Sequence, residues 1–193
     1  PEGVTRVGLA LEVSDGAPTG ESGNVWLDQC AVVRDQDNLL KNGSFESGED
    51  GRRFWLGGPQ PGVRITADAK TVIEGGRSLR IEYPAQAGQG IRQEVAVEEG
   101  ATYRLEAWFR AQNLDGKGVQ LVVKDVPSNG KALSTTSQFV NGTAKWTKST
   151  ISFTVPEGIY SLVVSINRPA DEHKSEGILW IDACALLREP AAS

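Results

Sequence analysis

Residues 102–110 read Thr-Tyr-Arg-Leu-Glu-Ala-Trp-Phe-Arg, and every second side chain in this stretch is apolar or aromatic. The two alternating sets are Tyr103, Leu105, Ala107 and Phe109 on one side, and Arg104, Glu106, Trp108 and Arg110 on the other. Successive side chains of a β-strand point to opposite faces of the sheet, so a period of two predicts a strand with one face in a core.

The same period recurs along the chain. Ile151, Phe153 and Val155 alternate with polar residues, and further strand-like runs cover 91–97, 119–124, 159–166 and 178–187. Turn-forming pairs such as Asn129-Gly130 and Asn141-Gly142 separate these runs, and no segment has a sustained helical stripe. Many short strands with regular turn signals predict an all-β fold, a jelly-roll β-sandwich of two antiparallel sheets.

An internal repeat suggests how the chain is divided. Pro1-Glu2-Gly3 recurs at 156–158, and a series of residues recurs 154 positions later, namely Gly23, Trp26, Asp28, Cys30, Ala31 and Arg34. We therefore expect residues 1–36 to be the terminal two-strand segment of a preceding similar module, or a linker hairpin. Residues 37–190 would form one complete module, and 191–193 a tail. An isolated hairpin is marginally stable, so we expect 1–36 to dock on this module or on a neighbouring chain.

Composition excludes several classes of function. The chain has 20 basic and 25 acidic residues, and its Lys and Arg residues form no dense cluster, so we expect no nucleic-acid partner. It has no run of 18 apolar residues, so we expect no membrane span. It also lacks Met, from which we expect these residues to have been cut from a longer polypeptide or produced behind a removed tag.

No catalytic signature is evident. His173 is the only histidine, and no Ser or Cys is marked as its nucleophilic partner. Cys30 and Cys184 occupy equivalent repeat positions, which predicts small apolar side chains within strands rather than a disulfide. Two cysteines and a distant histidine do not make a zinc site, and strand acids such as Glu106 have no evident partner. We therefore expect no enzymatic activity, and an esterase or hydrolase domain fits poorly.

An ordered series of motifs resembles carbohydrate-binding modules of the jelly-roll group formed by families 4, 9, 16 and 22. The series covers about residues 38–188 and consists of the stretch 38–46 (Asn-Leu-Leu-Lys-Asn-Gly-Ser-Phe-Glu), Trp55, the stretches 74–79 and 100–110, Trp146, the stretch 153–156, and Trp180-Ile181-Asp182. Such modules are attached to xylanases and glucanases. The resemblance implies a secreted or extracellular, non-catalytic module that binds a polysaccharide or oligosaccharide of the β-glucan or xylan type for an appended catalytic domain. The alternative is a structural spacer or adhesion module without a sugar ligand.

The resemblance also implies a structural calcium ion (Ca2+). Its ligands would be the carboxylates of Glu46, Glu74 and Asp182 with the backbone oxygens of Ser44 and Arg77. A hard cation prefers such oxygen ligands. The alternative is that Glu46 and Asp182 accept hydrogen bonds from nearby backbone amides.

Modules of this group bind glycans on a concave sheet, where aromatic faces stack on sugar rings and polar groups bond the hydroxyls. The residues expected on this face are Trp108, Glu106, Arg110, Gln93 or Arg92, Gln120 and Asn167, with Trp55 at the rim. Burial of Trp108 under a loop is the alternative, and Trp146 and Trp180 are expected to be structural. Known binders usually present two or more groove aromatics, so we expect modest affinity or a site that has lost its ligand.

Overall fold

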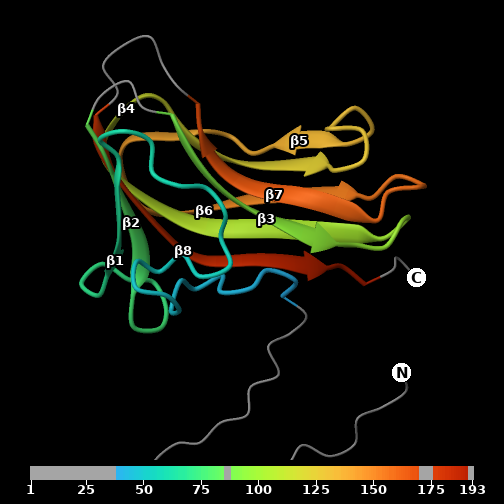
Figure 1. Cartoon of the computed structure of the whole chain (residues 1–193), viewed down its shortest axis with the longest axis horizontal. Helices are drawn as coiled ribbons and strands as arrows, with labels where there is room; N and C mark the ends of the chain where they lie inside the picture. The colour runs from blue at the N-terminus through green and yellow to red at the C-terminus, as the bar shows by residue number, and fades with distance from the viewer. Residues whose placement is uncertain (1–37, 85–87, 170–175, 191–193) are drawn as a thin grey trace, which may run out of the picture. The chain divides into compact units, whose positions relative to one another are not determined.

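The computed structural model describes residues 38–84, 88–169 and 176–190 (Figure 1). The expectations for residues 1–36, including Cys30, for His173 and for the tail 191–193 lie outside the described residues. The described part of the chain is built from eight strands: β1 (Arg64–Asp68), β2 (Ser78–Tyr83), β3 (Gln89–Ala96), β4 (Thr102–Asp125), β5 (Ser134–Thr136), β6 (Val140–Thr154), β7 (Ser161–Arg168) and β8 (Gly177–Arg188). It contains no helix that is long and apolar enough to cross a membrane.

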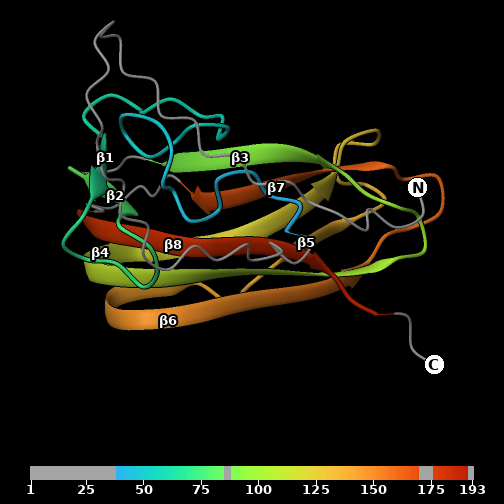
Figure 2. The same cartoon turned by 90° about the horizontal axis from the view of Figure 1, so that it is seen from below.

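The strands form two antiparallel sheets that share β4. The first, which we call the β8 sheet, has the order β1-β2-β8-β4-β6, and the second, the β7 sheet, has the order β3-β7-β4-β5. Figure 2 shows β3 and β7 on one side of the molecule and β8, β4 and β6 on the other. The predicted all-β jelly-roll sandwich is confirmed.

The long strand β4 passes from one sheet to the other. Its residues Tyr103–Gln112 pair with β8, whereas Gln120–Asp125 pair with β7. The pairing of β4 with β6 shifts register repeatedly between Phe109 and Val119, where Gly116 and Gly118 have positive φ values. A Cβ atom on Gly118 would lie 2.2 Å from the Val140 carbonyl oxygen, so only glycine fits this bend.

The core lies between the two sheets and contains the predicted inward-facing set. Tyr103, Leu105, Ala107 and Phe109 are all buried in it. The β7 sheet supplies the buried faces of β3, β4 and β7, whose apolar members include Ile91, Leu121, Val123, Leu162, Val164 and Ile166. Alternate residues on these same strands therefore point away from the core and form the outer face of the β7 sheet.

The segment that precedes β1 is fixed against β8. Asn38 binds β8 at two points: its Nδ2 donates to the Cys184 carbonyl oxygen and its Oδ1 accepts from the Leu186 amide, each at 3.0 Å. The Cys184 amide donates to the Gly43 carbonyl oxygen at 2.9 Å. Gly43 has no room for a side chain, because a Cβ atom would lie 1.9 Å from the Cys184 carbonyl oxygen. These contacts give a structural reason for Asn38 and Gly43 in the stretch 38–46.

Candidate functional site

The outer face of the β7 sheet carries a groove of about 840 Å³, which we call the sheet groove. Strand register places its floor residues in three rows. From β3 through β7 to β4 these rows are Gly90–Asn167–Gln120, Arg92–Ser165–Val122 and Glu94–Val163–Lys124. All of these residues except Gln120 line the groove, and Gln120 continues the first row beside it. A groove of this volume is in the range of small-ligand sites.

One wall of the sheet groove is the loop 56–60, which runs alongside β3. Leu56 and Arg92 exchange two backbone hydrogen bonds of 2.8 and 2.9 Å, which attach the loop to the strand. The buried Gln89 accepts from the Gln60 amide at 2.9 Å and donates to the Gly58 carbonyl oxygen at 3.1 Å. The side chain of Gln89 therefore fixes the conformation of this wall.

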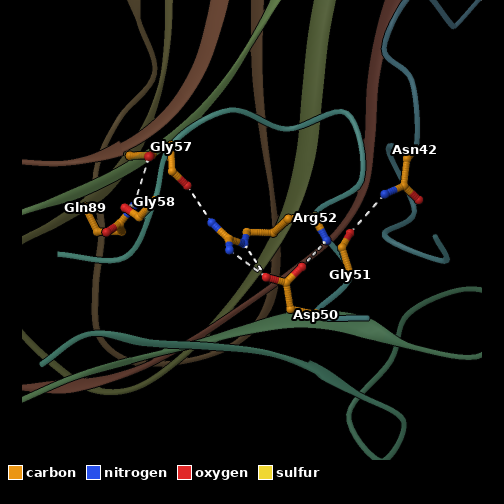
Figure 3. A network of polar contacts seen from close by, with 8 residues as sticks. Asn42, Asp50, Gly51, Arg52, Gly57, Gly58 and Gln89 are labelled. Atoms are coloured by element: carbon orange, nitrogen blue, oxygen red, sulfur yellow. Dashed lines mark hydrogen bonds and ion pairs between the residues drawn. The ribbon is translucent and has the colours of Figure 1, made fainter. Parts of the chain in front are cut away.

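An arginine supports the same wall from behind (Figure 3). Arg52 donates to the Gly57 carbonyl oxygen at 2.5 Å and holds Asp50 through two hydrogen bonds of 2.8 and 2.6 Å. Burial alone would raise the pKa of Asp50, but the hydrogen bonds and charge of Arg52 outweigh it and lower that pKa. Asn42 extends the network by donating to the Gly51 carbonyl oxygen at 2.9 Å.

Gly57 brings the wall close to the floor. Its φ of 114° lies in the region that favours glycine, and a Cβ atom would come within 2.3 Å of the Gly90 carbonyl oxygen. Gly58, the next residue, has nothing within 4 Å of such an atom. The close approach therefore depends on Gly57 specifically.

The turn after β4 forms the far end of the sheet groove, through Val126 and Asn129. Asp125 organises this turn, because its carboxylate accepts hydrogen bonds from the Ser128 amide and hydroxyl, at 2.7 and 2.5 Å, and from the Ala132 and Leu133 amides, at 3.1 and 2.9 Å. The hydrogen bonds from Ser128, Leu133 and Ala132 lower the pKa of Asp125 to about 2, against the opposing effect of burial. The Asp125 carboxylate therefore stabilises the turn.

The described lining of the sheet groove contains no aromatic residue. Its exposed or half-buried polar groups include an amide, a hydroxyl, a carboxylate and two basic groups, in Asn167, Ser165, Glu94, Arg92 and Lys124. Leu56 supplies an exposed apolar surface at the rim, where 60% of it is accessible. The arrangement suits hydrogen bonding to a polar, hydroxyl-rich ligand, with little stacking.

The expectation of a single face for the seven predicted sugar-binding residues is wrong. Asn167 and Gln120 do lie together on the outer face of the β7 sheet. Gln93, in contrast, is buried and bonds the Lys41 backbone through both amide atoms, at 3.0 and 2.7 Å, so Arg92 is the β3 residue on the outer face. Trp55 is buried, stacks on Phe45 and donates to the Asn42 carbonyl oxygen at 3.0 Å, so it is not a rim residue.

Trp108, Glu106 and Arg110 lie on the outer face of the other sheet, the β8 sheet. Glu106 forms ion pairs with Lys148 at 2.8 Å and Arg104 at 3.2 Å. The Arg110 guanidinium lies 5.6 Å from the centre of the buried Trp180 ring. These three residues lie on the part of β4 that pairs with β8, whereas Asn167 of β7 pairs with a later part of β4, after that strand has passed to the other sheet. Trp108 is half-buried, and it lines a smaller pocket of about 360 Å³ with Glu106, Ser44 and Glu74.

Two predicted calcium ligands, Glu46 and Asp182, bind the loop 73–77, which contains two others, Glu74 and Arg77. Asp182, which is fully buried, accepts from the Ile73 and Glu74 amides at 2.9 and 3.3 Å. Glu46 accepts from the Gly76 and Arg77 amides at 2.8 and 3.1 Å and has the Arg77 guanidinium 3.9 Å from its other oxygen. The backbone-amide bonding that we considered as the alternative is therefore present.

The oxygen donors near this loop suit a hard cation, but the carboxylates of Glu46 and Asp182 accept hydrogen bonds from backbone amides there. Burial raises the pKa of Asp182, the amide hydrogen bonds oppose this, and the charge of Glu46 adds to the rise. Burial and the charges of Asp182 and Glu74 raise the pKa of the buried Cys184 thiol. Across residues 38–84, 88–169 and 176–190, no group of three or more His, Cys, Asp or Glu side chains is placed to hold a metal ion.

Several solved structures with this fold are carbohydrate-binding modules. "Family 16 Carbohydrate Binding Module-2" is 22% identical, with a TM-score of 0.57 over 78% of this chain and 99% of that one. TmCBM61 "in complex with beta-1,4-galactotriose" is 23% identical, with a TM-score of 0.55 over 80% and 100% of the two chains. The CBM22-1 xylan-binding domain from Paenibacillus barcinonensis Xyn10C is 20% identical, with a TM-score of 0.51 over 81% and 97%.

Residues 37–172 match the carbohydrate binding domain family CBM_4_9. This match covers more than half of the chain, so the chain belongs to that family and is a carbohydrate-binding domain. No curated protein matches the chain significantly.

Proposed function

We propose that this domain binds a segment of a β-linked polysaccharide, of the β-glucan or xylan type, along the sheet groove. The observation that carries the proposal is the row-wise floor, in which Asn167 and Ser165 open into a groove of about 840 Å³ whose walls are held by Gln89 and Asp125. A preformed groove reduces the ordering cost of binding.

The chemistry of the sheet groove predicts modest affinity. Each hydrogen bond to a sugar hydroxyl replaces one to water, so its net contribution is about 0.5–1.5 kcal/mol. Without an aromatic among the described lining residues, stacking adds little. The solved structures support a sugar ligand by analogy, since one is described as a xylan-binding domain and another holds β-1,4-galactotriose.

Three further features of the protein belong to the same proposal. The domain serves an appended glycan-active enzyme, it acts outside the cell, and the loop 73–77 binds calcium through Glu46, Glu74 and Asp182 with the carbonyl oxygens of Ser44 and Arg77. The calcium proposal is supported by the donor types and by the convergence of Glu46 and Asp182 on one loop, and it requires these carboxylates to exchange their amide hydrogen bonds for the ion. When bound, the ion would supply positive charge and tie the first segment to β8.

Affinity gel electrophoresis tests this function against the spacer alternative. Native gels cast with soluble β-glucan or with xylan should retard the protein relative to an inert protein of similar charge. Unchanged mobility in both gels would favour a structural spacer. Release of product from a model ester or glycoside would instead indicate an enzyme.

A further inference from the structure

The floor of the sheet groove carries two exposed basic side chains, Arg92 on β3 and Lys124 on β4. Arg92 lies in the second row and Lys124 in the third, with β7 between their strands. From the strand spacing and rise, their Cα atoms are on the order of 12 Å apart across the floor. Both side chains are long enough to reach a ligand lying over Ser165.

Neither basic side chain forms an ion pair in the described part of the chain. No ion pair within 4.0 Å involves either of them, although other arginines of the domain are paired. Lys124 is exposed, and it packs beside Gly130, where a Cβ atom would lie 3.2 Å from its Cδ.

Two acids, Asp125 and Glu94, line the same groove, and neither forms an ion pair with Arg92 or Lys124. Asp125 is buried, and its carboxylate accepts hydrogen bonds from Ser128, Ala132 and Leu133. Glu94 lies two residues from Arg92 on the outward face of β3, is separated from Lys124 by β7, and accepts a 3.4 Å hydrogen bond from the Ser161 hydroxyl. The chain as a whole has a formal charge of −5, so two basic groups without ion pairs in one groove contrast with the net negative charge of the molecule.

We propose that the sheet groove takes an acidic glycan, one whose rings carry carboxylates, with Arg92 and Lys124 as the residues that select it. The inference rests on the proposed function, since it specifies the ligand of the same groove. A carboxylate presents two acceptor oxygens, which match the paired N–H donors of an Arg guanidinium and the point charge of a Lys ammonium. Asn167 and Ser165 would bond the ring hydroxyls that neutral and acidic glycans share.

Two ligands that differ only in their carboxylates test the effect of ligand charge on affinity. Cellotetraose and the β-1,4-linked tetraglucuronate differ only in the replacement of each C6 hydroxymethyl group by a carboxylate. Calorimetric titration of the whole chain at low salt should give an affinity about tenfold or more higher for the acidic tetrasaccharide, and the preference should shrink in about 0.5 M salt because exposed charges are screened.

Variants assign the preference to residues. Arg92→Gln and Lys124→Gln should each reduce the preference for the acidic ligand, measured as the ratio of its affinity to that of cellotetraose, several-fold. The control is Lys145→Gln, which removes the same charge from an exposed position on β6 outside the groove. Melting curves check that all three variants fold.

The outcomes separate this inference from the proposed function. Equal or tighter binding of cellotetraose would overturn the acidic-ligand inference and leave glycan binding intact. An equal loss of preference in Lys145→Gln would also overturn it, because the effect would then come from overall charge. Failure of both tetrasaccharides to bind would overturn the proposed function as well.

Discussion

Gly90 on β3 lies directly opposite Asn167 on β7, and a Cβ atom at Gly90 would come within 3.1 Å of the Asn167 Oδ1 atom. The missing side chain therefore leaves the Asn167 amide open to the sheet groove. Gly90 has no left-handed φ, so its role is spatial. Glycine within a strand lowers the stability of the strand. Access of a ligand to the Asn167 amide is a physical reason for a glycine at this position.

Filling the space at Gly90 should therefore block the sheet groove. Gly90→Val is compatible with a strand and should lower glycan affinity at least about tenfold, with a stability change within about 1 kcal/mol. Calorimetry and urea unfolding measure the two effects. The control is Ala96→Val, an exposed position on the same strand that does not line the groove. Full binding by Gly90→Val would show that ligand does not pass over Asn167.

The wall of the sheet groove should depend on Gly57 and not on Gly58. Gly57→Ala combines a φ of 114° with a Cβ position 2.3 Å from the Gly90 carbonyl oxygen, so it should cost about 1–3 kcal/mol of unfolding free energy. Gly58→Ala meets nothing within 4 Å and should change stability by about 0.5 kcal/mol or less. Urea denaturation compares the pair, and equal effects would mean that the wall does not approach β3 as described.

Asp125 should make the stability of the domain sensitive to acid. Its pKa is about 2 in the folded protein against an ordinary value of 3.8, so the carboxylate contributes stability that is present above about pH 4 and is lost as the pH falls toward 2. Asp125→Asn should be less stable than the wild type at neutral pH, and the gap should narrow between about pH 4 and pH 2.

Thermal melts over this pH range measure the Asp125 contribution. Asp115→Asn, which removes an exposed acid, is the matched control and should follow the wild-type pH profile. A constant gap between Asp125→Asn and the wild type across the range would contradict the assignment.

Calcium should stabilise the domain if the loop 73–77 binds it. An ion that binds only the folded state adds about 2.7 kcal/mol at one hundred times its dissociation constant, which corresponds to several degrees in Tm. The difference in Tm between excess calcium and excess chelator should vanish in Glu46→Gln and persist in Glu49→Gln, an exposed acid of the same segment. An identical melting curve in calcium and in chelator would remove calcium from the account.

Strict alternation predicted the core of this fold well. The inward set of 102–110 is buried, and the runs 91–97, 119–124, 159–166 and 178–187 overlap strands β3, β4, β7 and β8. Alternation even identifies the orientation of Gln93, because it is in phase with Ile91 and Val95 and is buried with them. The better β3 candidate on that argument is Arg92.

The site was harder to predict because it depends on contacts between distant segments. The expected strand near Phe109 continues to Asp125 after a series of register shifts, and this change of sheet separates Trp108 from Asn167. A single loop residue such as Trp55 has no period from which burial could be deduced. Lys124 lay within a predicted strand, but its position on the floor of a groove follows only from the pairing of β4 with β7.

The central claim, that glycan lies along the outer face of the β7 sheet, is tested most directly by comparing two variants in one binding titration. The double variant Ser165→Ala/Asn167→Ala removes the neutral polar groups of the groove floor, whereas Trp108→Ala alters the outer face of the β8 sheet. We predict that the double variant lowers affinity for the best-bound tetrasaccharide about tenfold, from two lost hydrogen bonds, and that Trp108→Ala leaves it within about twofold. Unchanged affinity in the double variant together with loss of binding in Trp108→Ala would contradict the account and place the sugar on the opposite sheet.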